Sequence, residues 1–190
     1  MISFLTVGQP GVASQSEWNE ESLMMQLAEV KEADLSFIEH RTSGFLIDKI
    51  KLTGTMRYRA PDMIEKSVET PFVENIKIKG DRISVEKISD RGESSIKTYS
   101  LSSMETLNTT VEGVRATLSG NLTLLKHNYE LELTGDASNW NITLTPKTPK
   151  MREFIEKITV SGRHNQISVI ETFDADGDES RLDLSYLPVK

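Results

Sequence analysis

Apolar and polar residues alternate with a period of two along most of this chain, most clearly between residues 51 and 59. Leu52, Met56 and Tyr58 fall on one side of this segment, whereas lysine, threonine and arginine side chains fall on the other. This period is typical of a β-strand with one covered face and one solvated face. Pro61 cannot donate a backbone hydrogen bond to a neighbouring strand, so we expect this strand to end at Ala60-Pro61-Asp62.

The same alternation begins at Leu35 and returns in short segments as far as the C-terminal region. Breaks such as Gly80-Asp81 and Gly135-Asp136 separate these segments and are typical of β-hairpins. Consecutive hairpins predict antiparallel pairing, which also suits a sheet with a solvated outer face. The further predicted strands are 62–69, 73–79, 82–89, 95–100, 128–134, 139–145, 153–161, 165–173 and 180–187.

Two stretches instead carry apolar residues at helical spacing. The first is capped by Ser16 or Asn19 and is predicted to run to about Ala33. The second is predicted to start at Ser102-Ser103 and to end or kink at Gly120, before a short segment at 122–126. The apolar side of the second stretch consists of Met104, Leu107, Val111, Val114 and Leu118.

Together these elements predict one α+β domain over residues 17–190, with about ten or eleven strands and two or three helices. Residues 1–16 contain small residues near Ala13 and Ser14, as a signal cleavage site does. They contain no basic residue, and Gly8-Gln9-Pro10-Gly11 interrupts any apolar core, so a complete signal peptide is not predicted. We expect residues 1–16 to be a flexible leader or a signal remnant.

Composition excludes several classes of function. The net charge of −7 argues against nucleic acid or an anionic membrane surface as the main partner. No apolar run is long enough to span a bilayer as a helix, so stable membrane insertion is not expected. The chain has no cysteine, and its three histidines lie on separate segments, so neither a metal site nor another cofactor is predicted. The acidic run at 174–180 lacks the glycine and glutamate positions of a calcium loop and is predicted to be a surface hairpin.

Charged residues fall on faces that the alternation assigns to the interior. If Leu35 and Phe37 point inward, strand parity places Glu39 and Arg41 inward as well, and a neighbouring strand does the same for Lys66. Burying a charge costs several kcal/mol unless it is paired or hydrated. Glu39, Arg41 and Lys66 therefore predict either an internal ion pair or polar groups that meet the head group of a ligand in a cavity.

Several motifs occur in an order that resembles one known family. They are Phe37-x-Glu39-x-Arg41, then Gly54-Thr55-Met56-Arg57-Tyr58-Arg59-Ala60-Pro61-Asp62, Pro71, Gly80-Asp81, a mid-chain helix, Trp140-Asn141-Ile142-Thr143-Leu144-Thr145-Pro146-Lys147 and a closing hairpin at 164–186. Over residues 17 to 187 the chain resembles the outer-membrane lipoprotein carrier LolA family, most closely a divergent branch of it.

The resemblance implies an incomplete, curved antiparallel β-barrel with helices that close a hydrophobic cavity. It also implies a periplasmic, monomeric, non-catalytic carrier for the acyl chains of a lipoprotein or lipid conjugate, which exchanges cargo with an inner-membrane donor transporter and an outer-membrane acceptor. The candidate cavity residues are Leu35, Phe37, Leu52, Met56, Tyr58, Ile64, Val68, Met104 and Leu107. The carriers proper have an arginine before the hairpin proline, which holds the helical lid shut; Ala60 stands there in this chain.

Two other classes of function share these strand patterns. An enzyme would use the inward Glu39 and Arg41, but the sequence offers no nucleophile or cofactor motif beside them, so we expect no catalysis. A structural or interaction module of the cell envelope would have the same strands around a filled core. An apolar cavity beneath the helices would favour the carrier over this module.

Overall fold

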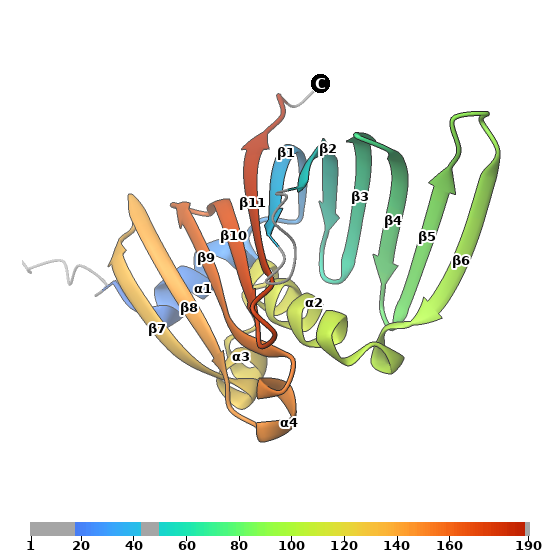
Figure 1. Ribbon diagram of the computed structural model, residues 1–190. Coiled ribbons are helices and arrows are strands. Elements are labelled where there is room, and N and C mark those ends of the chain that lie inside the picture. The colour runs from blue at the N-terminus through green and yellow to red at the C-terminus, as the bar shows by residue number, and fades with distance from the viewer. Residues whose placement is uncertain (1–17, 43–49, 189–190) are drawn as a thin grey trace, which may run out of the picture.

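The computed structural model describes residues 18–42 and 50–188 of the chain. The sequence also predicts a turn near Ser43-Gly44 after the first strand; this turn and the predicted leader at 1–16 lie outside these residues. Within them, every strand belongs to one antiparallel sheet of eleven strands, in the order β6-β5-β4-β3-β2-β1-β11-β10-β9-β8-β7. Figure 1 shows this sheet as a continuous curved surface that ends at β6 on one side and at β7 on the other. The sheet is therefore an open, incomplete barrel, as predicted.

The strands lie close to their predicted positions. Their bounds are β1 Glu32–Thr42, β2 Ile50–Arg59, β3 Met63–Thr70, β4 Val73–Lys79, β5 Arg82–Ile88, β6 Ser94–Ser100, β7 Tyr129–Asp136, β8 Asn139–Pro146, β9 Ile155–Arg163, β10 Gln166–Asp174 and β11 Glu179–Tyr186. The period-two pattern succeeds because the strands that pair with each other are neighbours in sequence. Among the described strands, the pairing of β1 with β11 is the exception, and it joins the two halves of the sheet. The outer face of β2 carries Arg57 and Arg59, which form ion pairs with acidic residues of β1.

Helices α1 (Glu20–Ala28), α2 (Glu105–Leu118) and α3 (Leu122–Asn128) agree with the predicted helical stretches, and α4 (Pro149–Arg152) is an addition. Asn19 caps α1 by accepting a hydrogen bond from the backbone N–H of Ser22. The prediction that this helix reaches Ala33 is wrong, because β1 already begins at Glu32 and pairs with β2. The short α4 begins at a Thr148 cap followed by Pro149, a combination typical of a helix start.

The prediction that the second helix starts at Ser102-Ser103 is also wrong, because α2 begins at Glu105. Both residues belong to the 3₁₀ turn η1 (Leu101–Ser103), and Met104 precedes α2 without a side-chain cap. The backbone N–H of Ser102 instead donates to Asp81, while the Ser103 hydroxyl donates to the carbonyl of Ser100. Asp81 thus binds the backbone of Ser102 in the 3₁₀ turn, and α2 begins only at Glu105.

Apart from a small cluster of Phe37, Leu52 and Val68, the apolar interior is divided between the two wings of the sheet. One cluster lies under β7 to β10 with α1 and α3, and includes Leu23, Leu125 and Trp140, whose Nε1 donates to the carbonyl of His164 at 2.9 Å. The other lies under β2 to β5, where Val111 of α2 packs. Helix α2 contributes to both clusters and in Figure 1 crosses between the two wings of the sheet. This crossing helix positions the candidate site.

Candidate functional site

A cavity of about 540 Å³ lies between α2 and the inner side of the curved sheet. Its volume falls within the range of roughly 300–1,000 Å³ that is usual for small-molecule sites. One wall is apolar and comes from β2 to β5 and from α2. The side chains of this wall are Met56, Ile64, Ile76, Ile78, Ile83, Leu107, Val111 and Val114.

The opposite rim of the cavity is polar and lies where β1 ends, β10 ends and β11 begins. Antiparallel register brings these three strand ends together, because Arg41 pairs with Ser180 and Thr172 pairs with the same serine. The polar lining residues of this rim are Arg41, Thr42, Thr172, Asp174, Asp178, Glu179 and Ser180. The cavity therefore has an apolar wall on one side, whereas on the other side polar strand ends accompany Ile170 of β10 and Leu182 of β11.

Between the wall and the rim lies a charged cluster centred on Glu39. The Glu39 carboxylate accepts hydrogen bonds from Arg41 Nε at 2.9 Å, from Ser180 Oγ at 3.0 Å and from Lys66 Nζ. The side chains of Glu39 and Lys66 are only 6% and 14% exposed, whereas that of Arg41 is 50% exposed. Glu39, Arg41 and Lys66 thus form an internal ion-pair cluster with Arg41 at its solvated end.

Burial and pairing act in opposite directions on the Glu39 carboxyl. Burial raises its pKa, but the charges and hydrogen bonds of Lys66 and Arg41 outweigh burial, so the pKa of Glu39 lies below its ordinary value. Burial lowers the pKa of Lys66, and Glu39 offsets part of this effect. The carboxylate is therefore ionised at neutral pH, and its negative charge is what allows an ammonium group to lie at this depth.

A glycine makes room for this cluster. Gly54 pairs with Phe37 on β1 and with Val68 on β3, and a Cβ at this position would lie 1.9 Å from the carbonyl oxygen of Ser67 and 3.1 Å from the Phe37 ring. The ring therefore lies close to the β2 backbone, and Lys66 Nζ lies 4.8 Å from its centroid. The ring face offers Lys66 a second favourable contact beside Glu39.

The structure places the predicted cavity residues at three kinds of position. Met56, Ile64 and Leu107 line the cavity, together with the three charged residues of the Glu39 cluster. The remaining predictions do not line it: Leu35, Phe37, Leu52, Tyr58 and Val68 are buried in the packed core, and Met104 is 37% exposed.

Several lining residues were not among the predictions, although a signal for them exists. Ile76, Ile78 and Ile83 occupy alternate apolar positions of β4 and β5, and Ile170 does so in β10. Their alternation marks them as inward, but only the curvature of the sheet brings them opposite α2. The acidic rim residues lie in the run 174–180 that was predicted to be a surface hairpin.

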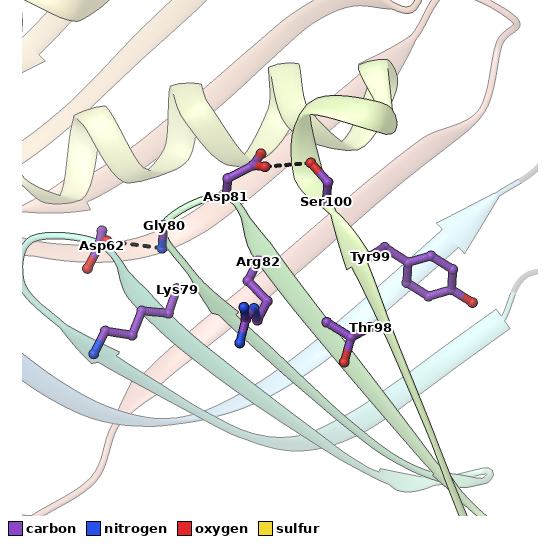
Figure 2. A pocket seen from close by; sticks show the side chains of 8 residues that line it. All are labelled: Asp62, Lys79, Gly80, Asp81, Arg82, Thr98, Tyr99 and Ser100. Atoms are coloured by element: carbon purple, nitrogen blue, oxygen red, sulfur yellow. Dashed lines mark hydrogen bonds between the residues drawn. The ribbon is translucent and has the colours of Figure 1, made fainter.

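A larger and more open hollow, of about 770 Å³, lies around the turn between β4 and β5 (Figure 2). Its carboxylates already accept hydrogen bonds within the protein: Asp62 from the backbone N–H of Gly80, and Asp81 from Ser100. In Figure 2 these bonds tie the turn to the neighbouring hairpin and to the segment that leads into α2. We assign this hollow a structural role, because its polar groups hold the approach to α2 in place.

The same turn also holds α2 through Arg115. Arg115 Nη1 donates to the carbonyl of Gly80 at 2.9 Å, and Nη2 lies 3.4 Å from Asp62 Oδ2. The resemblance raised the question of what holds the helical lid when Ala60 replaces an arginine. In this chain an arginine of the helix reaches the strand turns, instead of an arginine of the turn reaching the helix.

Two further observations concern membrane-spanning helices and groups of metal-ligating side chains. No helix among the described residues has the length and apolarity needed to cross a membrane. The same residues contain no group of three histidine, aspartate or glutamate side chains arranged to hold a metal ion.

Comparison with known proteins gives a family match and distant structural similarity. Residues 12–186 match the family described as "Outer membrane lipoprotein carrier protein LolA-like". The sequence matches none of the curated proteins compared with it.

Three solved structures are similar over most of the chain. A LolA superfamily protein from Nitrosomonas europaea has 12% identity and a TM-score of 0.45, over 90% of this chain and 94% of that one. A DUF1329 family protein from Desulfovibrio piger has 8% identity and a TM-score of 0.35, over 87% and 90% of the two chains. A putative outer membrane lipoprotein-sorting protein domain from Vibrio parahaemolyticus has 10% identity and a TM-score of 0.32, over 90% and 95%.

Proposed function

This chain belongs to the LolA-like family of outer membrane lipoprotein carrier proteins, and from that premise we propose that it is a non-catalytic periplasmic carrier. It holds one or more acyl chains of a lipoprotein or lipid conjugate in its cavity during transport to the outer membrane. It receives this cargo from an inner-membrane donor transporter and passes it to an outer-membrane acceptor. It acts as a monomer.

The observation that supports this proposal is the apolar wall of the cavity. Eight side chains of β2 to β5 and α2 form it, and none of them carries a charge. Each methylene group that leaves water for such a wall contributes roughly 0.8 kcal/mol, so an acyl chain gains affinity without specific polar contacts. Isoleucine, leucine, valine and methionine side chains suit chains of differing length, because none of them imposes a hydrogen-bond pattern.

Uptake of N-phenyl-1-naphthylamine, an uncharged probe that fluoresces in apolar surroundings, tests the proposal directly. We expect saturable fluorescence enhancement, and displacement of the probe by acylated molecules. Native mass spectrometry of protein purified gently from its own cell envelope is then expected to show an added mass that extracts as an acylated molecule. An apo mass together with no probe uptake would favour the interaction module with a filled core.

A blocking variant connects uptake to this cavity. Leu107 lines the cavity from α2, so Leu107→Trp is expected to fill part of the volume and to weaken probe binding at least about fivefold, by analogy with the loss of a few buried methylenes. Thr123→Trp adds the same indole at an exposed position of α3 and serves as the control. Equal probe binding by the two variants would place the bound probe elsewhere on the protein.

Location and assembly have their own tests. Cell fractionation is expected to recover the protein with soluble periplasmic markers, and light scattering coupled to gel filtration is expected to give the mass of one chain. Crosslinking in whole cells, with and without Leu107→Trp, tests whether exchange with membrane partners depends on a loaded cavity.

A further inference from the structure

The charges around the cavity carry information about the polar end of the cargo. Six charged residues line the cavity in the described part of the chain. Two of them, Arg41 and Lys66, are cationic. Four are anionic: Glu39, Asp174, Asp178 and Glu179. The lining therefore has two more negative than positive side chains.

The cations are also less available than their number implies. Lys66 is almost fully buried and donates to the Glu39 carboxylate, and Arg41 donates to the other oxygen of the same group. Glu39 thus accepts a hydrogen bond from each cation and pairs the buried Lys66 from within the protein. To reach Lys66, an anionic head group would have to displace Glu39 and leave a buried carboxylate without its partner, which is costly. At the half-exposed Arg41, it would lie in the same cavity rim as the carboxylates of Asp174 and Glu179.

The anionic side chains of the rim lie on the other strands. Asp174 ends β10 and Glu179 begins β11, and both line the cavity on the side away from the apolar wall. An acyl chain lying along β3 to β5 and α2 would leave its polar end at this rim. The rim would repel a negative head group and would attract or tolerate a positive or uncharged one.

We propose that the cavity selects acyl chains whose polar end is uncharged or cationic, such as esters and amides of fatty acids, and discriminates against free fatty acids and other anionic amphiphiles. This inference rests on the proposed carrier function and specifies the chemical class of its cargo. Asp174 and Glu179 are the residues that determine the specificity, whereas Glu39 keeps the buried Lys66 paired.

Three ligands that share the same lauroyl chain but differ in head-group charge test the inference. Laurate is anionic, monolaurin is uncharged and lauroylcholine carries a permanent positive charge. Each ligand is titrated against the naphthylamine probe bound to the full chain, at pH 8 and low salt and below the critical micelle concentration of the ligand. We expect lauroylcholine and monolaurin to bind more tightly than laurate by at least about threefold, the size expected for partly exposed charge pairs.

Charge-removing variants separate a local effect from the overall field of an acidic protein. Asp174→Asn combined with Glu179→Gln removes two rim charges and is expected to reduce the discrimination. Glu130→Gln combined with Glu132→Gln removes two charges at exposed positions of β7 and is expected to preserve it. Raising the salt concentration to 1 M shortens the screening length to about 3 Å and should also reduce the discrimination.

Each outcome has a distinct meaning. If laurate binds as tightly as the other two ligands, or if the rim variant discriminates as strongly as the β7 variant, the inference on cargo class is overturned while the carrier proposal stands. If no ligand of the series displaces the probe, and the probe itself does not bind, the carrier proposal fails. Circular dichroism of both double variants checks that each is folded before binding is compared.

Discussion

Substitutions of Glu39 and Lys66, which form a buried ion pair, should be strongly coupled in their effects on the free energy of unfolding. Both side chains are buried, so removing one partner leaves the other charge poorly solvated. Breaking a buried pair in this way typically costs about 3–5 kcal/mol, whereas replacing both partners with apolar residues is often close to neutral. We therefore consider Glu39→Met, Lys66→Met and the double variant.

The two single variants should differ, because Glu39 has more partners than Lys66 does. Glu39→Met removes the carboxylate that accepts the hydrogen bond of Lys66 and should cost about 4 kcal/mol, near the middle of the range for a broken buried pair. Lys66→Met leaves the carboxylate bonded to Arg41 and Ser180, so a loss of about 1.5 kcal/mol is expected, the value of one charged hydrogen bond. If the double variant loses about 1–2 kcal/mol, the coupling between the two sites is about 4 kcal/mol.

Urea unfolding followed by circular dichroism measures these free energies, provided that the slope against urea concentration is the same for all four proteins. The control is the pair Lys77 and Glu65 on the outer face, where Nζ and Oε1 lie 2.6 Å apart but the side chains are 55% and 28% exposed. Its coupling is expected to be about 0.2–1 kcal/mol, as for other surface pairs. Equal coupling for the inner and outer pairs would refute the argument, because it would mean that water screens the Glu39 cluster as effectively as the surface.

Three further predictions follow from individual side chains. Arg115→Met keeps the side-chain stem but loses the bond to Gly80, so we expect a loss of about 1–2 kcal/mol and faster hydrogen exchange of the α2 amides; unchanged exchange would exclude a role in holding the helix. The hydroxyl of Tyr58 is buried without a hydrogen-bond partner, so Tyr58→Phe should leave stability unchanged or raise it by up to about 1 kcal/mol in urea unfolding, and a clear loss would show that the hydroxyl has a partner. Burial, together with Asp176 and Asp178, raises the pKa of Asp174 to about 6. The folded chain therefore holds this proton more tightly than the unfolded chain, and the contribution of Asp174 to stability falls as pH rises from about 4 to about 6. Asp174→Asn should be more stable than the natural chain by up to about 1 kcal/mol at pH 7.5, a value reduced for partial exposure, and equally stable below pH 4; a difference that persists at low pH would contradict this assignment.

The local sequence pattern determined most of the strands of this protein. Alternation with a period of two reports which side of a strand is covered, and in an antiparallel meander each strand pairs with its neighbour in sequence. The segment 73–79 was therefore predicted with the same bounds that β4 has in the structure. Parity also predicted that Glu39 and Lys66 share the interior, because it depends only on residue spacing. The end of α1 and the start of α2 were mispredicted, since strand pairing at Glu32 and the carboxylate of Asp81 act from distant segments.

Tertiary structure alone decided which inward residues border the cavity and which fill the core. Phe37 and Ile64 have the same inward parity, yet Phe37 packs over Gly54 while Ile64 borders the cavity. The difference arises from the curvature of the sheet and from the path of α2, neither of which is encoded in the spacing along one strand. The acidic rim depends in the same way on the register that aligns the ends of β1, β10 and β11. Residue spacing thus determined the side on which each side chain lies, whereas the curvature of the sheet around α2 determined what it faces there.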